Sequence, residues 1–299
     1  MANAETAHKP VMLEEVLGFL PELEQGLLLD LTLGAGGHSE ALLAETSQLV
    51  RLVGLDRDPA ALALATERLA PFGDRFRPLH GVFGDARDVL DQAGINNEAA
   101  FVLADIGLSS MQLDSPTRGF SFRFDADLDM RMDSDDDGPR AIDLLDRKSP
   151  DELADLLHNY GDVGASKRFA KAVKVARREG KIAGTKDLAD FCRSFFGGQG
   201  KIHPATRVFQ ALRIAVNREW ENLDSLLKAL PTLLAPGGVA VIISFHSMED
   251  RLVKHAFKAH DAAGTLEILT PKPLVPSRTE QRVNPRSRSA KLRAARRIC

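Results

Sequence analysis

The sequence predicts an α/β fold in which a doubly wound parallel sheet carries an inserted helical domain. Short apolar stretches alternate with helical patterns through the first hundred residues. This alternation is typical of parallel strands with helices on both faces of the sheet. It stops after about Leu113 and returns near Val239, with helix-forming sequence between. We therefore expect one sheet domain that is interrupted after its fourth strand.

The expected strands are apolar runs bounded by turn residues. They are residues 27–31, 52–56, 76–80, 101–105, 239–245, 266–269 and 290–296. Helices are expected over residues 40–45 and from Pro59 onward, and prolines at 271, 273, 276 and 285 mark an irregular connection near the end of the chain. Because proline lacks a backbone N–H, this connection cannot be regular for long.

These elements give three segments. Residues 1–113 and 214–299 form the two parts of the cofactor-binding sheet domain, and residues 114–213 form the inserted helical domain. In that domain, Ser149, Pro150 and Glu152 have the pattern of a helix start. Ligands of open α/β sheets bind beyond the carboxyl ends of the strands. An insertion after the fourth strand is therefore placed to recognise a substrate.

A glycine-rich run, DLTLGAGGHS at residues 30–39, follows the first strand. Glycines such as Gly36 and Gly37 permit a tight turn and a close approach of backbone N–H groups to a nucleotide-like ligand. They can equally serve only to pack a helix against its strand. Asp56 ends the second strand 20 residues after Gly36, the spacing at which a carboxylate reaches ribose hydroxyls. The alternative for Asp56 is a cap of the helix that begins at Pro59.

The charge of this loop favours adenosylmethionine over a dinucleotide. A dinucleotide fingerprint has a third glycine where this chain has Ser39,. Asp30, at the end of the first strand, would repel a pyrophosphate but suits the cationic amino acid part of adenosylmethionine. A nicotinamide oxidoreductase remains the alternative.

Composition excludes several classes of protein. The 299 residues are 44% hydrophobic and 27% charged, as in an ordinary globular protein,. Residues 1–10 show no signal sequence, and no apolar run is long enough to span a bilayer,, so we expect a cytoplasmic protein without membrane contact.

Two cysteines and scattered histidines give no metal site. Within the acidic run 125–137, residues 133 onward match the start of an EF-hand loop, but Leu144 occupies the twelfth position of that loop, where a Glu is required,. We expect a solvated loop with Arg131 as counter-charge.

Basic residues gather in two places although the net charge is −3. One is a predicted helix with Lys167, Lys171, Lys174 and Arg178 on one face. The other is the segment from Lys272 onward, which includes Arg286 and Arg288 and holds nine Lys or Arg against the single acid Glu280. These elements suggest a surface for a polyanion, and the alternative is a solvated helix face. A catalytically silent RNA-binding factor would share them.

Polar residues follow the fourth and fifth strands. Asp105, with Ser109 and Ser110, could hold an exocyclic amine by hydrogen bonds, or the same residues could cap the next helix. His246 follows the fifth strand, where Ser247 and Asp250 look like a cap pair and His246 could be incidental. Phe245 could stack on a base.

Ordered blocks along nearly the whole chain resemble the small-subunit ribosomal RNA cytosine-N4 methyltransferases, the RsmH or MraW family. The blocks are residues 8–13, 32–39, 55–59, 105–110, 112–114, 118–122, 128–133, 203–207, 243–247 and 284–286. Met111, where proline is usual, and Leu31, where glycine is common, depart from the family pattern. Met111 affects the rigidity of the turn from Ser109 to Gln112. Leu31 could narrow the cofactor crevice.

The resemblance implies a class I methyltransferase fold, which is Rossmann-like, and S-adenosyl-L-methionine as cofactor. The residues that would hold it are Gly36, Gly37, His38, Asp56, Phe83, Asp105 and Gln112. The implied reaction is methylation of the exocyclic N4 of a specific cytidine in 16S ribosomal RNA, which tunes the decoding region. Asp105, Ser109, Ser110 and His246 would be the catalytic residues. The partner would be ribosomal RNA within a 30S particle, and the sequence leaves open whether the chain forms a homodimer.

Overall fold

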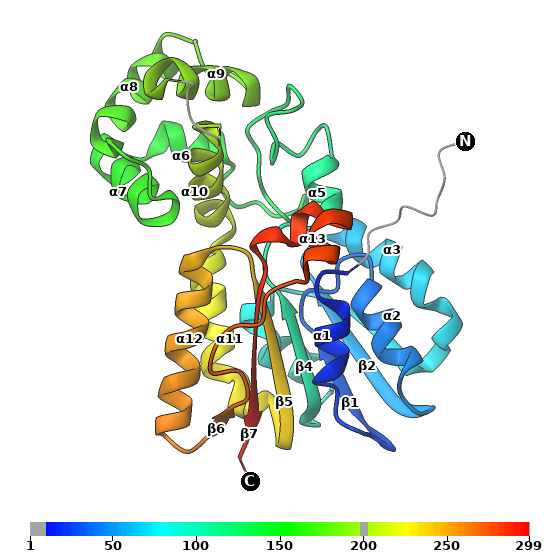
Figure 1. Ribbon diagram of the computed structural model, residues 1–299. Helices are drawn as coiled ribbons and strands as arrows, with labels where there is room; N and C mark the ends of the chain where they lie inside the picture. Colours follow the sequence, from blue (N-terminus) through cyan, green and yellow to red (C-terminus); the bar gives the residue numbers. More distant parts are fainter. Residues whose placement is uncertain (1–9, 198–202, 299) are drawn as a thin grey trace. The chain divides into compact units, whose positions relative to one another are not determined.

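The computed structural model describes residues 10–197 and 203–298, which divide into two compact units (Figure 1). The first combines Met1–Gly107 with Trp220–Cys299, and the second is Leu108–Glu219. The inserted unit therefore begins at Leu108 rather than residue 114 and ends at Glu219 rather than residue 213. An ion pair between Arg213 Nε and the buried Glu219, at 2.8 Å, ties the end of this segment to its own helices.

The first unit is built on a seven-stranded sheet in the order β3-β2-β1-β4-β5-β7-β6. The strands are β1 (Gln25–Asp30), β2 (Leu49–Asp56), β3 (Phe76–His80), β4 (Ala99–Asp105), β5 (Leu234–Ser244), β6 (Leu266–Ile268) and β7 (Lys291–Arg297). The predicted strands are all confirmed, most of them with one or both ends shifted. Strands β1 to β5 are parallel, whereas β7 runs antiparallel to both β5 and β6. The parallel arrangement predicted from the first hundred residues is confirmed, and the late strand β7 adds an antiparallel edge.

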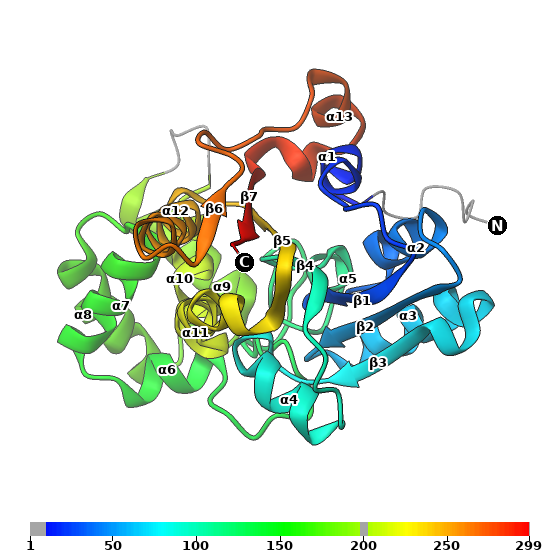
Figure 2. The same cartoon turned by 90° about the horizontal axis from the view of Figure 1, so that it is seen from below.

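Helices cover both faces of this sheet because its central strands are apolar on both sides. On β1, Leu27 and Leu29 face one core and Leu28 faces the other, as the two-residue period of a strand requires. One face packs against α4 (Ala86–Gln92), α11 (Glu219–Leu233) and α12 (Ser247–Ala262), and the other against α1 (Leu13–Gly18), α2 (Gly37–Ala44) and α3 (Pro59–Leu69). Figure 2 shows α1 and α4 on opposite sides of the strands. A further short helix, α13 (Arg278–Val283), precedes β7.

The inserted unit, taken by itself, is helical. Its helices are α5 (Ser110–Asp114), α6 (Ala141–Arg147), α7 (Pro150–Gly161), α8 (Ser166–Arg178), α9 (Thr185–Phe196) and α10 (Ala205–Asn217). The predicted start of α7 is confirmed, because Ser149 and Glu152 form a capping box. The predicted counter-charge is also confirmed: Arg131 lies 2.7 Å from Asp129 in the acidic loop. Over residues 10–197 and 203–298, no helix is long and apolar enough to cross a membrane.

Candidate cofactor and active site

Three aspartates end three neighbouring strands of the sheet. Asp30 is the last residue of β1, Asp56 of β2 and Asp105 of β4, and the sheet order places β2, β1 and β4 side by side. Since the carboxyl ends of parallel strands meet at one edge, the three carboxylates share that edge. The strands that carry Asp30 and Asp105 pair directly with each other, and Asp30 is opposite Leu103.

Asp56 organises the glycine-rich loop. Its Oδ2 accepts a hydrogen bond from Gly34 N at 2.7 Å, and its Oδ1 accepts one from Asp58 N at 2.9 Å. The cap of α3 is Asp58, whose Oδ1 accepts from Ala60 N at 3.1 Å. The interpretation of Asp56 as the helix cap is therefore wrong.

Asp30 links the loop to the tip of β4. The Ser39 hydroxyl donates to Asp30 Oδ2 at 2.6 Å, and Thr32 N donates to Asp30 Oδ1 at 3.2 Å. Thr32 Oγ1 in turn accepts from Asp105 N at 2.6 Å. Sequence reasoning weighed Asp30 only for its charge and missed Thr32, whose hydroxyl gives no recognisable pattern.

Three carboxyl groups are buried at this edge of the sheet. Burial raises the pKa of Asp30, Asp56 and Asp105 to about 6 in each case. For Asp105, His38 opposes this rise, while Asp30 and Glu249 add to it. Oδ1 of Asp105 is buried and has no hydrogen-bond partner. Such a group costs stability unless a ligand satisfies it. A cationic ligand with hydrogen-bond donors fits these residues, and a pyrophosphate does not.

The helix after the glycine-rich run begins at Gly37, earlier than the predicted Glu40. Gly36 caps it with φ 79°, and a Cβ at Gly36 would lie 3.2 Å from Leu69 Cδ1 of α3. The packing interpretation thus accounts for Gly36, and its role toward a cofactor stays a prediction. His38 is buried, with Nε2 2.9 Å from Val11 O.

The other predicted cofactor and catalytic residues belong to different units of the chain. Phe83 begins a short 3-10 helix, Phe83–Asp85, after β3 and is partly buried in the first unit. Ser109 and Gln112 belong to the inserted unit, where they form a capping box: Ser109 Oγ accepts from Gln112 N at 3.2 Å, and Gln112 Oε1 accepts from Ser109 N at 3.1 Å. The capping alternative is confirmed for Ser109. The side chain of Ser110 lies outside the described part of the structure.

His246 is the cap residue of α12. The predicted pairing of Ser247 with Asp250 is wrong, because Asp250 Oδ1 instead accepts from Arg293 Nε of β7 at 2.7 Å. Glu249 takes the third position of the helix, where its Oε2 accepts the backbone N–H of Phe245 at 3.0 Å. The three-residue spacing between cap and glutamate is a sequence signal that could have found Glu249.

The two basic elements differ in how much charge they leave exposed. On α8, Lys167, Lys171 and Arg178 are exposed, while Lys174 Nζ donates to Leu145 O at 2.8 Å and to Asp146 O at 2.7 Å. In the C-terminal segment, Arg288 is exposed and Arg286 is partly buried. The β7 arginines are engaged within the first unit: Arg293 pairs with Asp250, Arg296 with Glu267 and Arg297 with Glu98. The segment after residue 290 is therefore not the free basic surface that its composition suggested.

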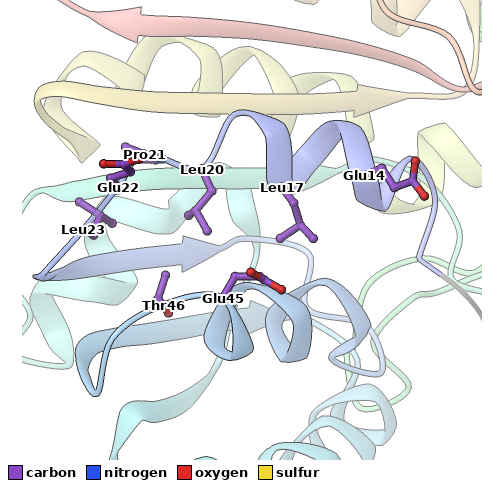
Figure 3. A pocket seen from close by; sticks show the side chains of 8 residues that line it. All are labelled: Glu14, Leu17, Leu20, Pro21, Glu22, Leu23, Glu45 and Thr46. Atoms are coloured by element: carbon purple, nitrogen blue, oxygen red, sulfur yellow. The ribbon is translucent and has the colours of Figure 1, made fainter.

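A surface pocket lies elsewhere in the first unit, beside α1 and the end of α2 (Figure 3). Glu14, Glu22 and Glu45 contribute carboxylates to its lining, together with apolar residues such as Leu17 and Leu20. None of the residues predicted to hold a cofactor lines this pocket. The three aspartates, with their buried carboxyl groups and an unpartnered carboxylate oxygen, are therefore the candidate site.

A Rossmann-like sheet with buried carboxylates at its strand ends fits a methyltransferase that uses the cationic methyl donor S-adenosylmethionine, and the family match shows this class. The MraW methylase family matches residues 5–298, and the chain belongs to this family. It is 47% identical to the ribosomal RNA small subunit methyltransferase H of Sorangium cellulosum, over 97% of this chain and 91% of that protein. It is 44% identical to the protein of the same name from Geobacter sulfurreducens, over 98% of this chain and 99% of that protein.

We expect the affinity for adenosylmethionine to fall as the pH drops below about 6. The pKa of Asp30, Asp56 and Asp105 is about 6 in the cofactor-free protein, so acid neutralises the charges that attract the cation. The same raised pKa values also affect the free energy of unfolding of the cofactor-free protein, because the protonated carboxyl groups favour the folded state. This stabilisation is complete below the unfolded pKa of 3.8 and is lost as the pH rises through about 6,. Calorimetric titration on both sides of this range measures the affinity. S-adenosylhomocysteine, which lacks the sulfonium charge, should show a weaker dependence, and equal pH profiles for the two ligands would contradict the charge argument.

Proposed function

We propose that the chain methylates the exocyclic N4 of a specific cytidine in 16S ribosomal RNA, in the decoding region, with the assembled 30S particle as substrate. The observation that carries this proposal is the near full-length similarity to proteins named ribosomal RNA small subunit methyltransferase H. The cytidine N4 specificity follows from the family resemblance and from the unpartnered carboxylate oxygen of Asp105. The test is methyl transfer to 30S particles and to free 16S RNA, and no transfer to either would overturn the proposal.

When bound, adenosylmethionine supplies an electrophilic methyl group on a sulfonium. We assign the ribose to Asp56, the amino acid end to the backbone at Gly36 and Gly37 beside His38, and the adenine to Phe83. The last of the predicted cofactor-binding residues is Gln112, which belongs to the inserted unit. The support in the structure is the loop held by Asp56 through Gly34 and the buried negative charge at the strand ends.

Asp105 is the proposed hydrogen-bond acceptor for the target amine. The lone pair of this amine is delocalised into the ring, so the amine must be oriented, and its N–H must be bonded as positive charge builds. Asp105 Oδ1 is buried and without a hydrogen-bond partner, which suits this role. Ser109, Ser110 and His246 are proposed to orient the base. Because a duplex hides N4, the cytidine must be unpaired or flipped out, and Phe245 is the proposed stacking partner.

We propose that the inserted helical unit recognises the RNA and that α8 supplies phosphate contacts, together with Arg286 and Arg288. Lys167, Lys171 and Arg178 are the exposed basic residues of the predicted face, and Lys174 is partly engaged by two carbonyl oxygens. The exposed charges of one helix can follow a phosphate backbone without reading sequence.

Replacing Lys167, Lys171 and Lys174 with Gln should weaken RNA binding and flatten its salt dependence. Each lost phosphate contact lowers the slope of log affinity against log salt by about 0.7 to 0.9. We expect most of this effect from Lys167 and Lys171. The matched control removes the same charge from α12, by Arg251, Lys254 and Lys258 to Gln, all three of which are exposed. If both triple variants bind RNA with the same salt slope, α8 is a solvated face.

A further inference from the structure

The turn between β5 and α12 holds a buried carboxylate against a histidine. Glu249 is 1% exposed, and its Oε2 accepts the backbone N–H of Phe245 at 3.0 Å and of His246 at 3.3 Å. Its other oxygen, Oε1, lies 2.7 Å from His246 Nε2. This last contact is close but lacks ideal hydrogen-bond alignment, since neither atom has a partner of good geometry. Both oxygens of Glu249 thus contact His246, one at its backbone N–H and the other at its ring.

The backbone contacts of Glu249 use its side chain as a hydrogen-bond acceptor. One oxygen takes two backbone N–H groups, and the residue sits in the first turn of α12, where the helix dipole stabilises negative charge,. An ionised carboxylate can only accept, so the proton of a neutral His246 belongs on Nε2. Nδ1 then keeps its lone pair, and this atom is buried without a hydrogen-bond partner.

The strand that leads to His246, β5, pairs with β4, the strand that ends at Asp105. Asp105 on β4 is opposite Ile243 on β5, and the ladder continues with Ile106 N donating to Ile243 O at 2.9 Å. The ring of Phe245 covers Gly107, where a Cβ would lie 3.2 Å from Phe245 Cδ2. A side chain at Gly107 would therefore displace this ring. The turn after β5 and the tip of β4 form one packed group within the first unit.

A second carboxylate fixes the helix that carries Glu249. The neighbouring Asp250 accepts from Arg293 Nε at 2.7 Å and lies 3.3 Å from Lys291 Nζ, both on β7. Arg293 is itself buried. The first turn of α12 is thus tied to the sheet on one side through Asp250 and holds His246 on the other through Glu249. Asp250 thus fixes the helix turn from which Glu249 reaches His246.

We propose that Glu249 is a positioning residue, which fixes His246 in the tautomer with its proton on Nε2 and presents the Nδ1 lone pair as an acceptor for an N–H of the target base. Carboxylates orient catalytic histidines in this way through the ring nitrogen that does not meet the substrate. The role toward the base rests on the proposed function. The tautomer is a property of the protein alone, so it can be tested without RNA.

The test begins with ¹⁵N-histidine NMR of the wild-type protein without RNA at about pH 8, where an ordinary histidine is neutral. His246→Ala assigns the resonance. We expect the Nε2–H tautomer in the wild type and its loss in Glu249→Gln, because a glutamine amide can donate to Nε2. A wild-type His246 protonated on Nδ1 overturns the proposal, whatever the RNA substrate proves to be.

Measurement of turnover in Glu249 and His246 variants is the second part of the test. Glu249→Gln retains an oxygen for the N–H groups of Phe245 and His246, so it should fold, and we expect kcat to fall by about tenfold or more with KM for adenosylmethionine unchanged. Glu249→Gln combined with His246→Ala should be no slower than His246→Ala alone, because both changes remove one function. Glu267→Gln, an exposed glutamate paired with Arg296, is the matched control. Additive losses in the double variant, or normal turnover of Glu249→Gln, would overturn the positioning role.

Discussion

Asp105→Ala is expected to lower kcat by about 10²- to 10⁴-fold at saturating adenosylmethionine, which is the range for loss of a group that assists proton movement in a transition state. The reason is the unpartnered Oδ1 at the tip of β4, which we assign to the amine of the target base. Because the backbone N–H of Asp105, not its side chain, bonds Thr32 Oγ1, the substitution leaves that link intact. Turnover with labelled methyl donor measures the effect.

The same substitution should not lower the thermal stability of the cofactor-free protein. Burial raises the pKa of Asp105 to about 6, so keeping its carboxylate ionised at neutral pH costs folding free energy,. Removal of such a group is neutral or stabilising when function alone retains it. Asp105→Asn provides the isosteric control. Near-normal turnover of Asp105→Ala would contradict its catalytic assignment, and a large loss of Tm would show that the residue is structural.

Asp56→Ala should weaken adenosylmethionine binding at least about tenfold, since hydrogen bonds to a charged group contribute about 1.5 to 3 kcal/mol each and 1.4 kcal/mol is a factor of ten in affinity. Two effects add here. The ribose loses its proposed acceptor, and the loop loses the bond from Gly34 N to Asp56 Oδ2 at 2.7 Å. Calorimetric titration gives the dissociation constant directly.

Two variants separate these effects from a general loss of charge. Asp56→Asn keeps one acceptor oxygen and the size of the side chain, so it should retain part of the affinity. Glu67→Ala removes an exposed carboxylate from α3 and should leave affinity unchanged. Equal affinity of Asp56→Ala and the wild type would remove Asp56 from the site.

The sheet could be predicted from the sequence because buried strands are apolar runs and turn residues bound them. Strand β3 matches the predicted residues 76–80 at both ends. The direction of β7 could not be predicted, since antiparallel pairing with β5 and β6 depends on contacts between residues far apart in the chain. For the same reason the composition of the last segment was misleading: Arg293 reads as a surface cation, but Asp250 neutralises it in the interior.

The candidate site could be predicted only in part. Asp56 and Asp105 could be predicted because they directly follow apolar runs that form strands. The roles within the loop were not visible, because Asp56 and Asp58 are both carboxylates near a helix start and only hydrogen bonds show that Asp58 is the cap. The sequence indicates Ser247 and Asp250 as a cap pair, whereas the cap of α12 is His246 and its partner is Glu249.

The most direct test of the proposed reaction is identification of the methylated nucleoside. Purified protein, methyl-labelled adenosylmethionine and 30S particles from cells lacking the protein would be incubated, and the RNA digested to nucleosides for mass spectrometry. Free 16S RNA in a parallel reaction distinguishes the assembled particle from naked RNA as substrate. We predict label in N4-methylcytidine from a single site of the 30S particle, and its absence with Asp105→Ala. Label on cytosine C5 or on a ribose 2′-oxygen would contradict the mechanism proposed for Asp105.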